Sequence, residues 1–256
     1  MALVLPFVAG LVNAEGFFIV GVYTSHLTGT VARAADALAK GHLRVAAAGF
    51  GLVVAFFAGA FIATSLVERA RRQQRARYSR ALGAEMFALF GVMVLGLTQT
   101  TSAPEPARLL VTTLFLSFAM GAQNALVTKL SGAVVRTTHL TGIVTDLGIE
   151  SVKGLASLRA LAEAPHDGEP GGQLWRVLVH VRTGPEFRRL RLHVAIFGSF
   201  FTGAVLGPVL YVLEGYTAMM LPVVVLTALI LFDTAVGFRT AEPASAADPP
   251  REPAQP

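Results

Sequence analysis

Two histidines stand in nearly identical strings of eight residues. Residues 24–31 read T-S-H-L-T-G-T-V and residues 137–144 read T-T-H-L-T-G-I-V, so six of the eight positions are identical. An imidazole titrates near neutral pH and can carry a proton, and threonine hydroxyls both donate and accept hydrogen bonds. A string with this chemistry, present twice, is the first candidate for a functional site.

An apolar stretch with the pattern Gly-x-x-Asn precedes each string. Gly10 and Asn13 precede the first, and Gly121 and Asn124 precede the second at an offset of 111 positions. The strings themselves are 113 positions apart, so a gap of two residues aligns the longer units. We interpret the match as an internal duplication.

The composition indicates a membrane protein. Of the 256 residues, 54% are hydrophobic and 14% are charged, whereas soluble domains carry about 25% charged residues. The chain has no cysteine, which excludes disulfides, thiolate metal sites and cysteine nucleophiles. The net charge of +5 is concentrated in basic residues between apolar stretches, at 69–80 and within 151–191. We assign these residues to membrane topology and not to nucleic-acid binding.

Six apolar stretches reach the length of about 20 residues that a membrane-spanning helix needs. The sequence therefore predicts an all-α, polytopic membrane helix bundle with about six full transmembrane helices. The stretches are residues 2–23, 45–67, 81–101, 109–128, 192–213 and 216–236.

The duplication divides the chain into two membrane repeats. We expect repeat 1 over residues 1–107 and repeat 2 over 108–239, with a cytoplasmic basic insertion at 151–191. Residues 240–256 are rich in Pro and Ala and are predicted to be a disordered tail. Within 151–191, basic residues beside Trp175 suggest a segment in the cytoplasmic membrane interface.

A short, broken or re-entrant helix is expected after each histidine string. If both short helices enter and leave the membrane on one side, both basic segments and both termini are cytoplasmic, and the repeats are inverted. If the short helices cross fully, the two basic segments fall on opposite faces, against the positive-inside rule. We favour the first arrangement, and a crossing that is half extended and half helical is the rival.

The strings carry residues that weaken a helix inside the bilayer. Backbone groups freed by such a break are tolerated only where protein or a water-filled cavity satisfies them. A helix that begins after Gly29 or Gly142 would direct its partly positive amides toward the membrane interior, where they favour an anion or polar solute. Paired discontinuous helices are typical of secondary transporters.

Several polar residues are expected to line a central solute site. Glu15 lies inside a span, where a carboxylate is costly and needs a partner. The full set is Asn13, Glu15, His26, Thr28, Gly29, Gln123, Asn124, His139, Thr141, Gly142 and Asp146.

Structural interpretations stand beside the functional ones. The two histidines can instead hydrogen-bond across a packed repeat interface, and the two asparagines can join helices. Glu85 and Asp233 are interpreted as interface carboxylates, Glu85 paired with Arg80 or a neighbour. Glycines within the spans are interpreted as close-packing positions, namely Gly51, Gly59, Gly203 and Gly207.

These motifs resemble those of the YoaK-like bacterial membrane proteins, domain-of-unknown-function family 1275. The resemblance runs from about residue 7 to 236 and includes M-G-A-Q-N-A-L at 120–126. It implies an integral inner-membrane protein of about six helices and no established activity. Asn13 stands where the family usually has Asp, and Thr30 and Ile143 stand where it usually has Asn. Glu15 is then a candidate to replace the acidic group.

We therefore predict a small-solute or anion transporter, not an enzyme, with no cofactor and no resident metal. We expect it to lie in the bacterial inner membrane and to bind no nucleic acid. A homodimer is one assembly that it could form. One alternative is a non-transporting scaffold or partner protein. The other is an intramembrane enzyme in which the two histidines and a carboxylate hold a metal, although the chain has no H-E-x-x-H or G-x-S-x-G motif.

Overall fold

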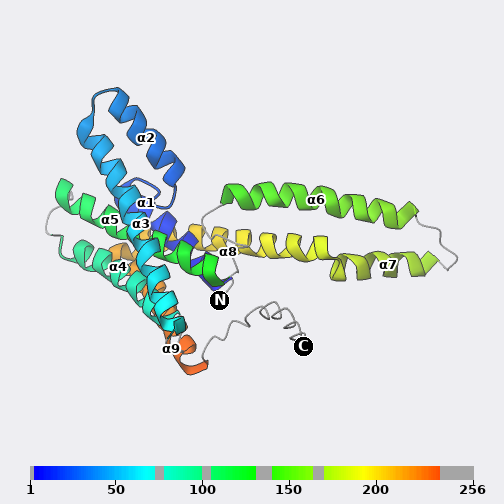
Figure 1. Ribbon diagram of the computed structural model, residues 1–256. Helices are drawn as coiled ribbons and strands as arrows, with labels where there is room; N and C mark the ends of the chain where they lie inside the picture. Colours follow the sequence, from blue (N-terminus) through cyan, green and yellow to red (C-terminus); the bar gives the residue numbers. More distant parts are fainter. Residues whose placement is uncertain (1–2, 73–77, 100–104, 131–139, 164–169, 237–256) are drawn as a thin grey trace, which may run out of the picture.

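The computed structural model describes residues 3–72, 78–99, 105–130, 140–163 and 170–236, and every regular element in them is helical (Figure 1). The all-α prediction is confirmed for this part of the chain. The helices are α1 (Val4–Val20), α2 (Leu27–Ala39), α3 (Leu43–Arg72), α4 (Ser79–Leu97), α5 (Pro106–Leu130), α6 (Leu140–Glu163), α7 (Pro170–Thr183), α8 (Pro185–Glu214), the 3₁₀ helix η1 (Gly215–Met219) and α9 (Met220–Val236).

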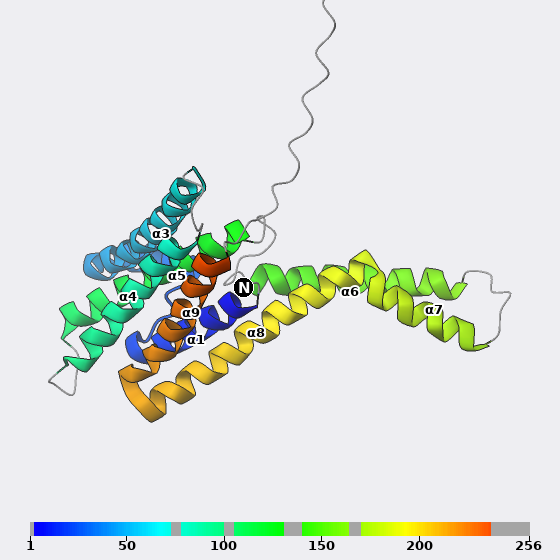
Figure 2. The same cartoon turned by 90° about the horizontal axis from the view of Figure 1, so that it is seen from below.

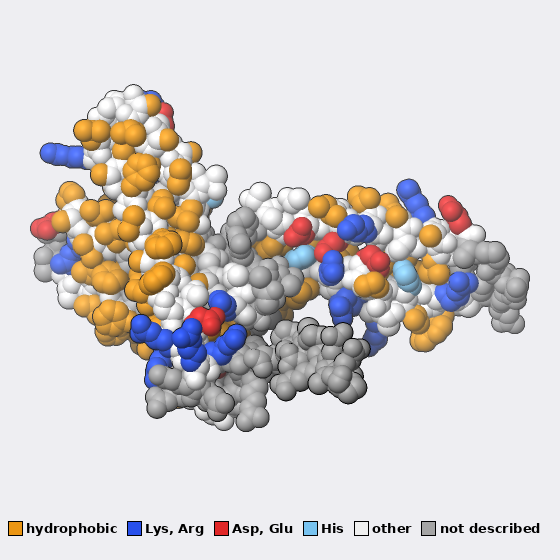
Figure 3. All heavy atoms as spheres, viewed as in Figure 1, with side chains coloured by type: hydrophobic (Ala, Val, Ile, Leu, Met, Phe, Trp, Pro, Cys, Tyr) orange, Lys and Arg blue, Asp and Glu red, His pale blue; other side chains and the backbone are white. Residues whose placement is uncertain are grey.

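Within the described residues, four segments are long and apolar enough to cross a membrane by length and composition, and the last of them joins α8, η1 and α9. Helix α1 is also apolar but has 17 residues. Apolar side chains cover the side of the bundle, while Lys and Arg gather where α3 ends (Figure 3). The segments are Leu43–Arg72, Ser79–Leu97, Pro106–Leu130 and Pro185–Ala235.

Helices α1 and α8 lie side by side and run in the same direction. At one end the Ser199 hydroxyl donates a hydrogen bond of 2.5 Å to the carbonyl of Leu3. At the other end the rings of Phe18 and Tyr211 are in contact, with centroids 6.4 Å apart. Helices α3 and α5 form a second parallel pair, in which Lys129 makes a 2.8 Å ion pair with Glu68.

Glycines allow both pairs to pack backbone against backbone. A Cβ on Gly10 would overlap the carbonyl oxygen of Phe200, and a Cβ on Gly203 would overlap that of Phe7. Small residues permit this close approach of helices in a membrane, where van der Waals packing drives association.

The α3–α5 pair repeats this arrangement. A Cβ on Gly59 would overlap the carbonyl oxygen of Phe118, and a Cβ on Gly121 would overlap that of Phe56. The close-packing interpretation is therefore confirmed at Gly59, as it is at Gly203. A Cβ on Gly51 would make only an ordinary contact, at 3.7 Å from Leu114.

Asp233 joins α9 to the start of α4. Its carboxylate accepts hydrogen bonds from the backbone amides of Tyr78 at 3.0 Å and Ser79 at 2.8 Å, and from the Ser79 hydroxyl at 2.5 Å. A carboxylate is favourable at a helix N-terminus, where the first amides have no partner within the helix. Asp233 thus caps a helix, a role that its position near a span end did not reveal.

The second short helix was predicted wrongly, because α6 has 24 residues and continues well into the 151–191 segment. Its inner side repeats at helical spacing, with Glu150 and Gly154 against α8 and Ser157 against α7. The predicted basic insertion at 151–191 therefore begins inside α6. Helices α6 and α7 project from the bundle as an arm, which we define as residues 140–163 and 170–183 (Figure 1).

Two alanine substitutions in α8 test the glycine packing. Gly203→Ala should lower the free energy of unfolding by about 1–3 kcal/mol, because the added methyl group meets the α1 backbone. Gly198→Ala is the matched control, since a Cβ there has no atom within 4 Å, and it should be neutral or stabilise by up to about 1 kcal/mol. Unfolding in detergent micelles measures both, and equal midpoints would contradict the packing account.

Candidate functional site

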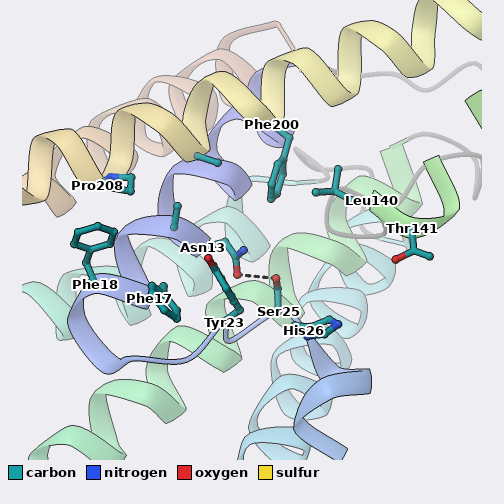
Figure 4. Close-up of a pocket in the computed structure, with 12 residues that line it drawn as sticks. Asn13, Phe17, Phe18, Tyr23, Ser25, His26, Leu140, Thr141, Phe200 and Pro208 are labelled. Carbon is teal, nitrogen blue, oxygen red and sulfur yellow. Dashed lines mark hydrogen bonds between the residues drawn. The ribbon is translucent and has the colours of Figure 1, made fainter. Parts of the chain in front are cut away.

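A pocket of about 410 Å³ lies between α1, α8 and the starts of α2 and α6 (Figure 4). Its lining combines aromatic rings with an amide, hydroxyls and an imidazole. The lining residues are Asn13, Ala14, Phe17, Phe18, Tyr23, Ser25, His26, Leu140, Thr141, Phe200, Ala204 and Pro208.

Both histidine strings reach this pocket. Ser25 and His26 come from the first string, and Leu140 and Thr141 come from the second. His139 and the rest of residues 131–139 lie outside the described part of the chain. The structure thus brings two segments that are more than 100 positions apart in the sequence to one cavity.

The connector after α1 folds back along that helix. The Ser25 hydroxyl donates a hydrogen bond of 2.7 Å to the side-chain oxygen of Asn13 (Figure 4). Asn13 lies about two turns before the end of α1 at Val20. The first string therefore does not continue outward from the end of α1 but returns toward the middle of the helix.

His26 occupies the N-cap position of α2, and the position of its ring explains why residue 29 is a glycine. Its ring lies over the first turn, where a Cβ on Gly29 would be 2.5 Å from the imidazole Nδ1. The His26 carbonyl accepts hydrogen bonds from the backbone amide of Thr30 at 3.0 Å and from its hydroxyl at 3.1 Å. Glycine is the residue that lets the imidazole fold against the helix while it faces the pocket.

The pocket favours a negatively charged or neutral polar guest. Two helix N-termini meet it, α2 through its N-cap His26 and α6 through its first residues Leu140 and Thr141. These ends carry partial positive charge and amides without partners in their helices. The described lining residues include no carboxylate, so no full negative charge among them would repel an anion.

Helix α8 contributes an acceptor to the same wall. Pro208 lies inside the helix and has no amide hydrogen, so the carbonyl of Ala204 one turn earlier receives no hydrogen bond from that position. Both residues line the pocket. The wall therefore contains a carbonyl that can accept a hydrogen bond. It also contains a proline, a residue at which helices bend.

Two predicted site residues are buried away from the pocket. Glu15 is fully buried, its Cβ lies close to Gly207 of α8, and neither carboxyl oxygen has a hydrogen-bond partner among the described residues. Gln123 is fully buried as well, and its amide donates to the carbonyl of Leu5 at 3.1 Å. Gln123 thus ties α5 to α1.

The other predicted residues within the described segments do not line the pocket. Asn124 and Gly142 are half-buried, and Thr28 and Asp146 are exposed. Within the described residues, no three His, Asp or Glu side chains gather closely enough to hold a metal ion.

Sequence reasoning missed the aromatic wall and misread Glu85. Tyr23, Phe17 and Phe200 line the pocket, yet nothing distinguishes them in the sequence from lipid-facing aromatic residues. Glu85 is fully buried, and both its oxygens lack a hydrogen-bond partner in the described segments, so the expected pairing with Arg80 is wrong. A signal was present, because Glu85 shares a helical face with buried residues three and four positions away, Ala81, Leu82, Ala88 and Leu89.

A helical bundle with several apolar segments of membrane-spanning length and a polar pocket defines a polytopic membrane protein. The family described as protein of unknown function (DUF1275) matches residues 1–232, and the chain belongs to this family. The UPF0700 transmembrane protein YoaK of Bacillus subtilis (strain 168) is 28% identical over 148 residues. That alignment covers 57% of this chain and 63% of YoaK, less than two thirds of its length. No solved structure matches.

A double-mutant cycle tests the bond that holds the connector on α1. Asn13→Ala and Ser25→Ala should each destabilise the protein, and the double variant should lose about 1 kcal/mol less than the sum, because one hydrogen bond is shared. Unfolding free energies in detergent give the coupling. Strictly additive effects would mean that the connector is not fixed by this contact.

Proposed function

We propose that the protein is a membrane transporter of small anions, with its solute site in the pocket where the two histidine strings meet. The observation that carries the proposal is that Ser25 and His26 line the same cavity as Leu140 and Thr141. A volume of about 410 Å³ falls in the range of small-molecule pockets. The proposal treats the chain as a transporter without enzymatic activity, cofactor or resident metal.

The chemistry of the lining supports an organic anion. The ends of α2 and α6 and the imidazole of His26 would bind the charged group. The hydroxyls of Tyr23 and Thr141 can donate further hydrogen bonds, and the rings of Phe17 and Phe200 suit an apolar portion of the solute. A small carboxylate with a short apolar body matches these groups best.

Contacts at the middle of the bundle support re-entrant connectors. The carbonyl of Thr24 accepts a hydrogen bond of 3.4 Å from Ser117, near the midpoint of α5. Helix α6 begins with Leu140 in the same pocket as Phe200, near the midpoint of α8. Both strings would therefore return to the middle of the membrane before a helix leaves on the side of entry, so that six helices cross.

The packing pattern supports inverted repeats. Exchanging the two halves maps α1 onto α5 through the Gly-x-x-Asn pattern, and maps α8 onto α3 as the helix that each packs against. Gly10 of repeat 1 contacts α8 of repeat 2, just as Gly121 of repeat 2 contacts α3 of repeat 1. In a bacterial inner membrane with both termini on the cytoplasmic side, α1 and α8 would run outward from the cytoplasm. Helices α3 and α5 would run inward.

This arrangement suggests how the pocket would open to alternate sides. Each parallel pair is held tightly at its glycines, so the α1–α8 pair and the α3–α5 pair can move as two bodies. Rocking of one body against the other around a fixed central site is the usual mechanism of transporters with inverted repeats. Pro208 lies in α8 at the pocket wall, where a bend would change access to the solute.

Substitutions in the strings should abolish anion flux without preventing membrane insertion. Thr141→Val and His139→Ala each remove a polar group from the second string, and Thr234→Val on an exposed face of α9 is the matched control. Proteoliposomes with a panel of acetate, benzoate, nitrate and phosphate measure the flux. We expect uptake of at least one anion by the parent protein and the control, and none by the two string variants.

Two results would contradict the transport proposal. Equal flux in all variants would remove the string from the mechanism. No flux of any anion across the panel, by protein that is correctly folded and inserted, would favour a non-transporting scaffold or partner protein.

Cysteine labelling tests the topology in this cysteine-free chain. Cysteines at Arg72, the last residue of α3, and at Ala156, in α6, should react with an impermeant thiol reagent only from the cytoplasm. Cysteines at His42 and Glu105 should react only from outside. All four positions are exposed on the protein. Labelling of Ala156→Cys from outside would mean that the short helices cross the membrane fully.

A further inference from the structure

Helices α7 and α8 form an elbow at the end of the last basic segment. Gly184 separates the end of α7 at Thr183 from the start of α8 at Pro185, and α7 bends away from the axis of α8 (Figure 2). The guanidinium of Arg191 donates to two carbonyls at the end of α7, Val181 at 2.5 Å and Arg182 at 2.8 Å. These bonds satisfy carbonyls that the helix end leaves free and fix the angle of the elbow.

A groove of about 680 Å³ lies along this elbow and combines apolar and cationic side chains. Trp175 is 68% exposed and Leu178 is 53% exposed, although both are large apolar residues. No described helix covers them. The groove is lined by Trp175, Leu178, Val179, Val181, Arg182 and Arg191.

The groove lies at the level of the lipid headgroups in the proposed orientation. Arg191 immediately precedes residues 192–213, the apolar part of α8, so it marks the cytoplasmic end of that span. Tryptophan is favoured at this depth because its ring is amphipathic. Helix α7 ends at this boundary, and its axis is bent away from that of the span, as expected for a helix in the interface (Figure 2).

The charge around the groove complements an anionic lipid. Residues 170–191 contain one acidic residue, Glu186, against five arginines, which are Arg176, Arg182, Arg188, Arg189 and Arg191. A guanidinium presents paired donors that match phosphate oxygens. Basic residues beside a span attract the anionic lipids of the cytoplasmic leaflet.

We propose that the α7–α8 elbow binds anionic phospholipid, with Arg182 at the phosphate and with Trp175 and Leu178 at the boundary between headgroups and acyl chains. The proposal rests on the cytoplasmic placement of residues 151–191 and is independent of whether the protein transports a solute. It gives the basic insertion a binding role in addition to its role in topology.

The chain contains a single tryptophan, so its fluorescence reports on Trp175 alone. The full-length protein is reconstituted into phosphatidylcholine vesicles and into vesicles of phosphatidylcholine with increasing phosphatidylglycerol, with bromine atoms on the acyl chains. We expect the emission to move to shorter wavelength and to be quenched as the fraction of phosphatidylglycerol rises, and we expect added salt to weaken both effects.

Variants of the groove separate lipid binding from simple burial. Arg182→Gln should raise the phosphatidylglycerol fraction needed for half-maximal quenching roughly fivefold. This factor corresponds to the binding free energy that one basic residue contributes near an anionic membrane surface. Leu178→Ser should reduce the blue shift. Val152→Ser, at an exposed apolar position of α6 away from the groove, is the matched control and should change neither.

Two outcomes would overturn the proposal. One is identical emission and quenching with and without phosphatidylglycerol. The other is a blue shift in lipid-free detergent that grows with protein concentration, which would mean that a second copy of the chain covers the groove. Unchanged thermal unfolding of the two groove variants in detergent confirms that the loss of quenching is not a loss of fold.

Discussion

The arrangement of this bundle depends on backbone-to-backbone contact at glycines of the paired helices, namely Gly10, Gly59, Gly121, Gly203 and Gly207. A membrane offers no hydrophobic driving force between helices, so close packing must hold them together. Each glycine removes the Cβ that would otherwise separate two helix axes. The result is two parallel pairs, α1 with α8 and α3 with α5, against which α2, α4 and α6 pack, while α9 is held on α4 through Asp233.

The connector that precedes α2 and the first residue of α6 contact the surrounding helices. A backbone interrupted inside a bilayer must find hydrogen-bond partners in the protein. At the first break the hydroxyl of Ser117 donates a hydrogen bond to the backbone carbonyl of Thr24. The side chain of Ser25 adds a bond to the side chain of Asn13, which fixes the connector on α1. The start of the second broken helix lies in the same cavity through Thr141. Two breaks that converge on one pocket place two helix N-termini where an anion would bind.

The sequence predicted the helical class and the close packing at Gly59, Gly203 and Gly207, because hydrophobic periodicity and small residues within apolar stretches leave direct traces in residue order. It did not predict close packing at Gly10 and Gly121, which were noted only as parts of a repeated pattern. It could not predict which apolar side chains line a pocket, since Phe200 reads like any lipid-facing residue. Nor could it predict Asp233, whose partners at the start of α4 are more than 150 positions away. The length of α6 was missed because the polar and basic residues from 151 on were assigned to an insertion, although the helix continues to Glu163.

The most direct test of the account asks whether the two strings face each other across one cavity. Ser25→Cys and Thr141→Cys can be combined in the cysteine-free chain and treated in membranes with a short bifunctional thiol reagent. The account predicts efficient intramolecular cross-linking, and a solute that binds the pocket should slow it. No cross-linking of this pair, or equal cross-linking of a control pair of Ser25→Cys with Thr234→Cys, would contradict it.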